Sequence, residues 1–278
     1  MDLMYALKAA IIGVVEGLTE FLPISSTAHI VLTQRALGFD DPGEVFGVTI
    51  QLGAILAVVI YFWRRLWAVA STLHTSTASR RFVLGLMVAS IPAAVLGLSL
   101  NKWLESHVFG DQVGWIIAVT STLGGVAIIL IERLQLTVRH SDSATLPLRT
   151  CLWIGVFQVM AMIPGVSRSG AGILGAMCLG VERKAATEFS FFLAIPIMVG
   201  ASGLKLVKHR DALHGDLLGA LVIGFIVSFA VALLVVHWLL RYVATHRFTP
   251  FGWYRIIGGL ILAGLLAAGI ATDAFTKG

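Results

Sequence analysis

The sequence predicts an all-α protein that crosses a membrane several times as helices. Of its 278 residues, 58% are hydrophobic and only 13% are charged, whereas soluble domains carry about 25% charged residues. Six apolar segments are each long enough to span a bilayer as a helix. They are residues 44–63, 82–100, 113–131, 187–204, 217–239 and 253–272. We therefore expect one polytopic membrane domain that covers residues 1–278.

Residues 5–36, which precede the first expected span, are apolar but too interrupted for a clean crossing. Two glutamates, Glu16 and Glu20, stand within this segment, and Pro23 follows them. Proline breaks a helix because it lacks a backbone N–H group, and the freed polar groups need partners at membrane depth. We expect a re-entrant helix–loop–helix hairpin here; a kinked full span is the alternative.

The second half of the chain repeats this layout. Residues 150–182, which precede the fourth span, are broken by Pro164 and Gly165, and we expect a second re-entrant hairpin there. In both segments a serine cluster follows the proline. The stretch Ile12-Gly-Val-Val-Glu16 also matches Ile154-Gly-Val-Phe-Gln158.

A polar linker, residues 132–149, separates the two halves. Repeat one covers about residues 1–135 and repeat two about residues 145–278. Because each repeat contributes three spans, an odd number, the second must be inverted relative to the first. Inverted repeats with broken helices place a site near the middle of the bilayer, where the two hairpin loops would converge.

The loop between the first two spans carries Arg64, Arg65, Arg80 and Arg81 and no acidic residue. Loops rich in arginine remain in the cytoplasm, so we place this loop on the cytoplasmic side. The formal net charge of +5 comes from loops of this kind. Without a basic stripe on a soluble face, we expect membrane lipid and no nucleic acid as a partner.

Glu16 and Glu20 are four residues apart and therefore share one face of a helix. An ionised carboxylate at membrane depth costs roughly 2.5–3.5 kcal/mol on insertion scales, so two together indicate a polar site. Hard divalent cations bind carboxylate and phosphate oxygens, and we expect Mg²⁺ or Ca²⁺ at this pair. The alternative is that the pair is satisfied by Thr19, His29 or an arginine of the bundle.

The residues after Pro23 read as a loop that enters a new helix. Ser25, Ser26 and Thr27 are candidates for the helix N-cap, and a helix start offers free N–H groups to an anion. His29 follows Ser26 by three residues, so a hydroxyl and an imidazole lie on one face, as in a nucleophile–base pair. The alternatives are plain capping by the hydroxyls and a hydrogen-bonding strut formed by the histidine.

Arg168 is the only basic residue between positions 151 and 181. The planar guanidinium is suited to phosphate oxygens, and neighbouring glycines let the backbone approach a ligand closely. A buried salt bridge to either glutamate is the alternative, and both roles can coexist. The residues expected to contact substrate are Ser25, Thr27, Gly165, Ser167, Ser169 and Gly170.

At residues 16–29 and 164–171 the chain resembles the undecaprenyl-diphosphate phosphatase family of bacterial inner membranes, the bacitracin-resistance type. The motifs are Glu16-Gly-Leu-Thr-Glu20-Phe-Leu-Pro-Ile-Ser-Ser-Thr-Ala-His29 and Pro164-Gly-Val-Ser-Arg168-Ser-Gly-Ala. The resemblance implies hydrolysis of undecaprenyl diphosphate to the monophosphate lipid carrier of peptidoglycan synthesis. It also implies a divalent cation, an inverted-repeat fold, a site open to the periplasm and a possible homodimer.

Three positions depart from the expected pattern. Ala28 stands where the family often has glycine, and Gly172 stands where the second motif usually ends in threonine. The glycine removes a possible contact to phosphate or to a metal-bound water. Gln158 occupies the position of a first-half carboxylate, so we expect one site per chain rather than two.

The mechanism we expect is in-line attack by Ser26 on the distal phosphorus. Glu16 and Glu20 would hold the cation, Arg168 would neutralise charge on the phosphate, and His29 or Glu20 would accept the serine proton. Water would then hydrolyse the phosphoserine; direct attack by water is the alternative. The rival function is a transporter or flippase of isoprenoid diphosphate lipids, whose folds share inverted repeats and broken helices.

Overall fold

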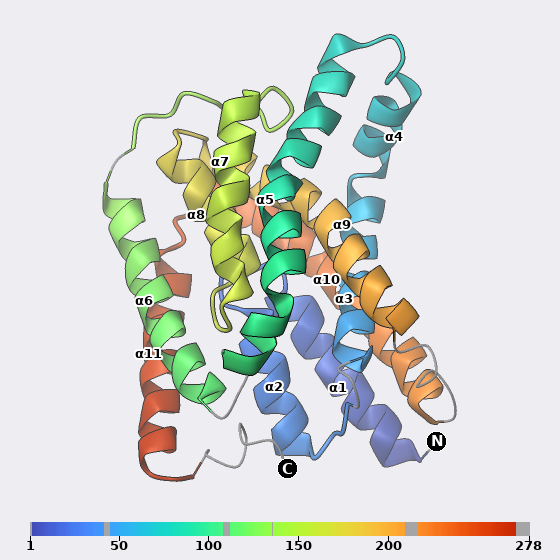
Figure 1. Ribbon diagram of the computed structural model, residues 1–278, viewed down its shortest axis with the longest axis vertical. Helices are drawn as coiled ribbons and strands as arrows, with labels where there is room; N and C mark the ends of the chain where they lie inside the picture. Colours follow the sequence, from blue (N-terminus) through green and yellow to red (C-terminus); the bar gives the residue numbers. More distant parts are fainter. Residues whose placement is uncertain (1, 42–44, 108–111, 135, 209–215, 271–278) are drawn as a thin grey trace.

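The computed structural model describes residues 2–41, 45–107, 112–134, 136–208 and 216–270. Regular structure in these residues is helical, apart from an isolated bridge between His140 and Val181. The helices are α1 (Leu3–Thr19), α2 (Ser26–Leu37), α3 (Val45–Tyr61), α4 (Trp63–Ser71), α5 (Thr77–His107), α6 (Val113–Arg133), α7 (Leu148–Val159), η2 (Met160–Met162), α8 (Arg168–Cys178), α9 (Arg183–Lys208), α10 (Asp216–Thr245) and α11 (Thr249–Ala267). Figure 1 shows them as one bundle.

The prediction of a polytopic helical membrane protein is confirmed. Five helices within the described residues are long and apolar enough to cross a bilayer: α5, α6, α9, α10 and α11. A sixth span results if α3 and α4, which meet at a 71° bend, are counted as one broken span. Residue 44 of the first predicted span and residues 271–272 of the last lie outside the described part of the chain.

The two interrupted segments form pairs of short helices. α1 and α2 have 17 and 12 residues, and α7 and α8 have 12 and 11, whereas about 20 residues are needed to span a bilayer. In Figure 1 the outer ends of α1 and α2 lie at the bottom of the molecule, and those of α7 and α8 lie toward the top. The breaks in both pairs lie between these ends. Re-entry from opposite membrane faces stays a prediction.

Each short pair is fixed to a long helix of the other half. α1 packs on α10 and α7 packs on α5, and glycine allows both contacts. A Cβ atom added to Gly17 would lie 2.7 Å from the carbonyl oxygen of Ser228, and one added to Gly155 would lie 2.1 Å from that of Ala89. Any larger residue would force the helices apart, so these glycines allow each short pair to pack closely on its long helix.

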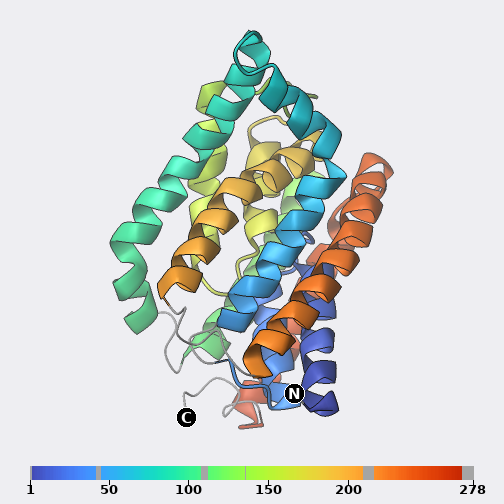
Figure 2. The ribbon, with the colours of Figure 1, turned by 90° about the vertical axis from the view of Figure 1, so that its right-hand side faces the viewer.

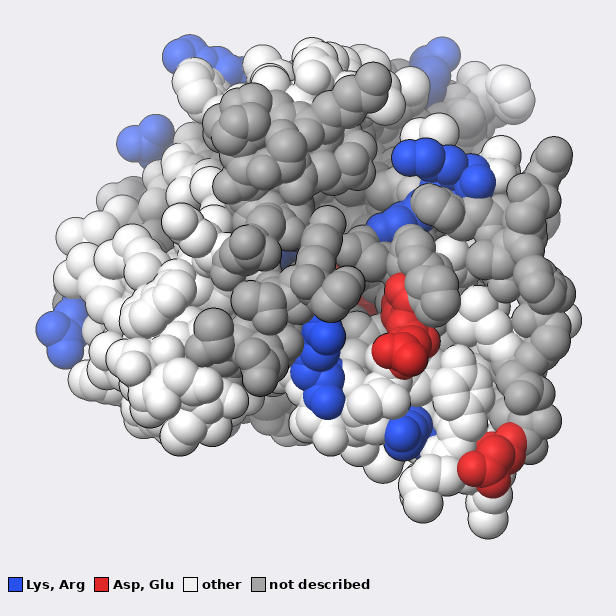
Figure 3. All heavy atoms as spheres, turned by 60° about the horizontal axis from the view of Figure 1, so that its bottom comes forward, with Lys and Arg blue, Asp and Glu red and all other residues white. Residues whose placement is uncertain are grey.

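The remaining long helices form the frame around the pairs. α3 lies between α9 and α10, and the three helices slant in the same direction (Figure 2). Near the bend between α3 and α4, Arg65 donates to Glu188 Oε2 at 2.8 Å and to Ser143 Oγ at 2.9 Å. This contact ties the linker between α6 and α7 to α4 and α9. On the opposite face, basic and acidic side chains are scattered among uncharged ones (Figure 3).

Candidate active site

Glu20 is the point at which the two interrupted segments meet. Its Oε2 atom accepts a hydrogen bond of 2.5 Å from Ser26 Oγ, and its Oε1 atom lies 2.8 Å from Arg168 Nη2. Glu20 and Arg168 are both largely buried, with side chains 5% and 14% exposed. The two loops therefore meet inside the bundle, as the predicted mechanism requires.

Glu16 lies one turn before Glu20 on α1 and is fully buried. It is close enough to Glu20 and Arg168 for their charges to interact, but neither of its carboxylate oxygens has a hydrogen-bond partner. A buried carboxylate in this state needs a proton or a cation, because removing a charge from water is costly unless it is paired. The buried, unpartnered carboxylate of Glu16 therefore fits a bound cation.

The second loop is joined to the first by hydroxyl groups. Ser167 caps α8 by accepting a hydrogen bond of 3.1 Å from Gly170 N. Both Ser167 Oγ and Ser169 Oγ donate to the carbonyl oxygen of Leu22, at 3.3 Å and 2.8 Å. These contacts span the two halves of the chain and hold Arg168, which begins α8, opposite Glu20.

Arg255 of α11 braces both loops, and sequence reasoning missed it. Its guanidinium donates to the carbonyl oxygens of Pro23 at 3.2 Å and Gly165 at 2.9 Å, one from each loop. It also donates to Thr120 and Ser121 of α6. The signal was available, because Arg255 is the only charged residue of α11, and an intramembrane charge is a functional candidate by default.

The imidazole of His29 contacts groups other than the hydroxyl of Ser26. Its Nδ1 atom lies 2.7 Å from the carbonyl oxygen of Ser25, and because a carbonyl only accepts, Nδ1 must carry a proton. Its Nε2 atom lies 2.7 Å from the hydroxyl of Tyr254, and the two rings are stacked. With both ring nitrogens occupied, His29 supports the backbone at Ser25, whereas Glu20 is the group in contact with the serine hydroxyl.

Ser25, which His29 supports, has an unusual backbone. Its φ angle of +73° is the only positive value at a non-glycine residue in the described chain. Such backbone conformations cost of order 1–3 kcal/mol and persist only where the surroundings enforce them. The strained residue directly precedes Ser26, the first residue of α2, so the strain sets the direction of the candidate nucleophile.

Unpartnered buried polar atoms gather in one region of the described chain. They belong to four side chains: Glu16, Gln158, Arg168 (its Nε atom) and Ser190. Buried polar groups normally have partners, and exceptions mark places that suit a water, an ion or a ligand. Ser190 was not predicted as a site residue, although the stretch from Glu188 to Pro196 also resembles the family.

Gln158 and Ser190 face each other across Gly172. A Cβ atom added to this glycine would lie 3.4 Å from Gln158 Oε1 and 3.0 Å from Ser190 Oγ. Arg168 joins the same group, because its Nη1 atom donates to the carbonyl oxygen of Ser190 at 3.3 Å. The departure from threonine at position 172 therefore leaves two buried polar side chains without the partner that a hydroxyl could provide.

A cavity of about 250 Å³ adjoins these groups. Its polar lining includes Glu20, Ser26 and Arg168, and of the six predicted contact residues it includes Ser25, Thr27 and Ser167. The other three, Gly165, Ser169 and Gly170, are not among its lining residues. In this structure they hold the loops instead: Gly165 accepts from Arg255, Ser169 donates to Leu22, and Gly170 donates to Ser167.

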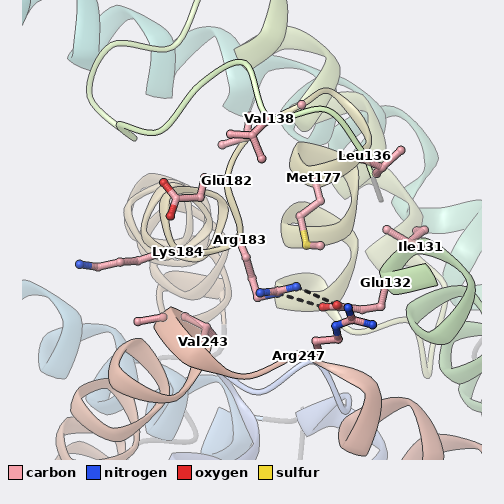
Figure 4. A pocket seen from close by; sticks show the side chains of 13 residues that line it. Ile131, Glu132, Leu136, Val138, Met177, Glu182, Arg183, Lys184, Val243 and Arg247 are labelled. Atoms are coloured by element: carbon pink, nitrogen blue, oxygen red, sulfur yellow. Dashed lines mark hydrogen bonds and ion pairs between the residues drawn. The ribbon is translucent and has the colours of Figure 1, made fainter. Parts of the chain in front are cut away.

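A second cavity of about 230 Å³ lies between α6, α9 and the end of α10. Figure 4 shows Arg183 and Glu132 facing each other there, with Lys184 pointing away. Glu132 accepts hydrogen bonds of 3.0 Å and 2.8 Å from Arg183, and another of 3.0 Å from the backbone of Phe248. Because these charges are already satisfied, we assign the chemistry to the first cavity.

Metal ligation in the first cavity would rest on few protein groups. Within the residues that the structure describes, no group of three or more His, Cys, Asp or Glu side chains is arranged to hold a metal ion. Glu16 and Glu20 offer two carboxylates, of which Glu20 lines the cavity and Glu16 is buried and not among its lining residues. Divalent cations also take phosphate oxygens and water as ligands, so an ion that bound together with a diphosphate would not depend on protein carboxylates alone.

Comparison with known proteins gives one consistent result. The family model of the bacitracin resistance protein BacA matches residues 9–261. An undecaprenyl-diphosphatase of Acidovorax ebreus is 47% identical over 98% of this chain and 99% of its own length. Undecaprenyl-diphosphatases of a Caulobacter strain and of Rhizobium meliloti are each 46% identical, over 94% and 91% of this chain and 97% and 94% of their own lengths.

Proposed function

The chain belongs to the bacitracin resistance protein family, and from this premise we propose that the cavity between its two loops is the active site of an undecaprenyl-diphosphate phosphatase. The enzyme is a multi-pass protein of the bacterial inner membrane. It hydrolyses undecaprenyl diphosphate to undecaprenyl phosphate and phosphate, which supplies the lipid carrier for peptidoglycan synthesis. The observation that supports this site is Glu20, in contact with both Ser26 and Arg168.

Ser26 is the proposed nucleophile. Its Oγ atom attacks the distal phosphorus in line, and its proton passes to Glu20 Oε2, the atom that already accepts its hydrogen bond. The bond from the distal phosphorus to the bridging oxygen breaks, and undecaprenyl phosphate leaves. Water then cleaves the phosphoserine. Direct attack by water, with Ser26 as a contact to the phosphate, is the alternative, and the position of Glu20 serves that route equally well.

Arg168 stabilises the charge that spreads over the phosphate oxygens during transfer. In the free protein its Nη2 atom is neutralised by Glu20, but its Nε atom has no partner. A phosphate that enters the cavity can accept from Arg168 Nη2 in place of Glu20. The ion pair with Glu20 keeps the side chain aimed at the cavity until then.

We propose that Glu16 and Glu20 bind a divalent cation, Mg²⁺ or Ca²⁺. Such an ion, when bound, supplies positive charge that neutralises the diphosphate. Glu16 fits this role because both of its oxygens are buried and unpartnered. Glu20 can contribute Oε1, once Arg168 has turned to the phosphate, while Oε2 keeps its contact with Ser26.

We also propose that the cavity opens to the periplasm. Arg80 and Arg81 near the start of α5 mark the cytoplasmic end by the positive-inside rule. Gly97, which lines the cavity, lies 16 residues further along this helix, or about 24 Å at 1.5 Å per residue. Ala93 also lines the cavity and lies about 18 Å along the helix from Arg81, so the cavity extends from near the middle of the membrane toward the opposite side. The homodimer implied by the resemblance is likewise a proposal, and the mass of the detergent-solubilised protein tests it.

Phosphate release from undecaprenyl diphosphate by the purified protein tests the assignment of the site. We expect Arg168→Ala to lower kcat/KM by about 10²-fold or more, the usual effect of removing a group that stabilises transition-state charge. Arg241→Ala is the matched control, because Arg241 is exposed on α10 away from the cavity. Wild-type activity in Arg168→Ala would contradict the site, and a pure lipid transporter would release no phosphate at all.

A further inference from the structure

The residues that line the active-site cavity divide into a polar group and an apolar group. Its polar lining comes from the two loops, with Glu20, Ser26 and Arg168, and from Gln51 and Gln158. Its apolar lining, which we call the apolar end, comes mainly from three elements: α5, the turn η2 and α9. Ala93 and Gly97 contribute from α5. A lipid diphosphate has the same division, with a charged head and a hydrocarbon chain.

α5 forms a thin wall between this cavity and the surface of the bundle. Ala93 and Gly97 are four residues apart, so both lie on one face of the helix, toward the cavity. Val95 and Leu98 lie on other faces and are 55% and 75% exposed. In the most apolar window of α5 only 11% of residues are buried, against 39% in α9. A hydrocarbon chain that passes the small side chains of α5 thus reaches the lipid-facing surface directly.

Both helices that border the apolar end carry a proline next to a lining residue. Pro92 of α5 precedes Ala93, and Pro196 of α9 precedes Ile197. Each proline removes one hydrogen bond from its helix, so both helices are weakened at the same level of the cavity. The contact between α5 and α9 is therefore where the walls can separate most easily.

We infer that the isoprenoid chain of the substrate leaves the site between α5 and α9, and that Gly97 determines how much hydrocarbon can pass. The inference rests on the proposed function. A cavity of about 250 Å³ is smaller than the usual 300–1,000 Å³ of a small-molecule site and cannot enclose a C55 chain. The chain must leave the cavity, and its apolar end is the wall that accepts hydrocarbon.

Gly97 is suited to a test because it has space around it. An added Cβ atom would meet only Met162 Cε, at 3.9 Å, so Gly97→Leu places a larger side chain in the passage without a clash against the backbone. Gly200→Leu is the matched control. Gly200 lies on the outer face of α9, where an added Cβ atom meets nothing within 4 Å.

The kinetic experiment compares three ligands: undecaprenyl diphosphate, the shorter farnesyl diphosphate, and methylenediphosphonate as a head group without a chain. We expect Gly97→Leu to raise KM for both lipids by about tenfold or more, with an unchanged inhibition constant for methylenediphosphonate and no effect of Gly200→Leu. An equal loss of lipid and head-group binding, or no change in either, would overturn the inference. If the wild type releases no phosphate from either lipid, the proposed function fails instead.

A second experiment uses the unaltered protein, so it does not depend on how a variant folds. A farnesyl diphosphate analogue with a photoreactive group on its terminal isoprene unit is bound and irradiated, and the labelled peptides are identified. We expect labels on α5 near Gly97 or on α9 near Ile197, and competition by undecaprenyl diphosphate. Labels confined to α1, α2 or α10 would place the chain on a different path and overturn the inference.

Discussion

Arg168 donates a hydrogen bond of 2.8 Å to Glu20 across 148 residues of the chain. The pair joins the tip of one interrupted segment to the tip of the other, at the wall of a cavity. Removing one partner of a buried ion pair leaves an uncompensated charge, which costs about 3–5 kcal/mol. The same contact that holds the loops together therefore also keeps the two charged groups where a diphosphate needs them.

Replacing Ser26 by alanine decides between the two routes of hydrolysis. If Ser26 is the nucleophile, Ser26→Ala should lower kcat by at least about a thousandfold, and wild-type enzyme quenched in acid should carry phosphoserine at position 26. Phosphate release and mass spectrometry measure these effects. Near-normal turnover would exclude the covalent route and leave direct attack by water.

Removal of divalent cations should abolish activity. Chelation leaves Glu16 and Glu20 as two neighbouring carboxylates, and added Mg²⁺ or Ca²⁺ should restore phosphate release. Glu16→Gln should raise the cation concentration for half-maximal activity by about tenfold or more, because one charged ligand is lost. Full activity in excess chelator would rule out the proposed cation.

His29 and Tyr254 should behave as one unit that supports Ser25. We expect His29→Ala and Tyr254→Phe each to lower kcat/KM by about tenfold, and the double variant to lose little more, because interacting residues are not additive. General-base catalysis contributes about 10²–10⁴-fold. A loss of that size in His29→Ala, with no effect of Tyr254→Phe, would show that His29 takes the serine proton.

Arg255→Met should loosen both loops at once. Four carbonyl oxygens lose their donor, and hydrogen bonds to charged groups are worth about 1.5–3 kcal/mol each. We expect the free energy of unfolding to fall by at least about 3 kcal/mol, with a parallel loss of phosphate release. Thermal unfolding in detergent measures the first effect, and Arg241→Met serves as the control. An unchanged melting temperature would contradict the bracing role.

Position 172 offers a test with two side chains of the same shape. The hydroxyl of Gly172→Thr should pair with Ser190 or Gln158, whereas the methyl group of Gly172→Val leaves both unpartnered. Because both residues are β-branched, their difference isolates the hydrogen bond. We expect the threonine variant to be more stable than the valine variant by about 1–3 kcal/mol, measured by thermal unfolding. Equal stabilities would show that neither group needs a partner.

Composition and local pattern predicted much of this molecule. The apolar segments became the long helices, and the breaks at Pro23 and Pro164 became the loops of two short helix pairs, because hydrophobic length and proline act locally. The roles of Arg255, Tyr254 and Ser190 were missed for a physical reason. The groups that they contact lie on other helices, many residues away along the chain. No local spacing in the sequence records such a contact.

The packing of each short pair on the opposite half has a consequence for biogenesis. Gly17 contacts Ser228, so about 200 further residues must be made before α1 meets its permanent neighbour. At about 5–20 residues per second, a ribosome needs roughly 10–40 s for this. During that interval α1 lacks the helix on which it packs, so the site cannot take its final form before α10 has entered the bilayer.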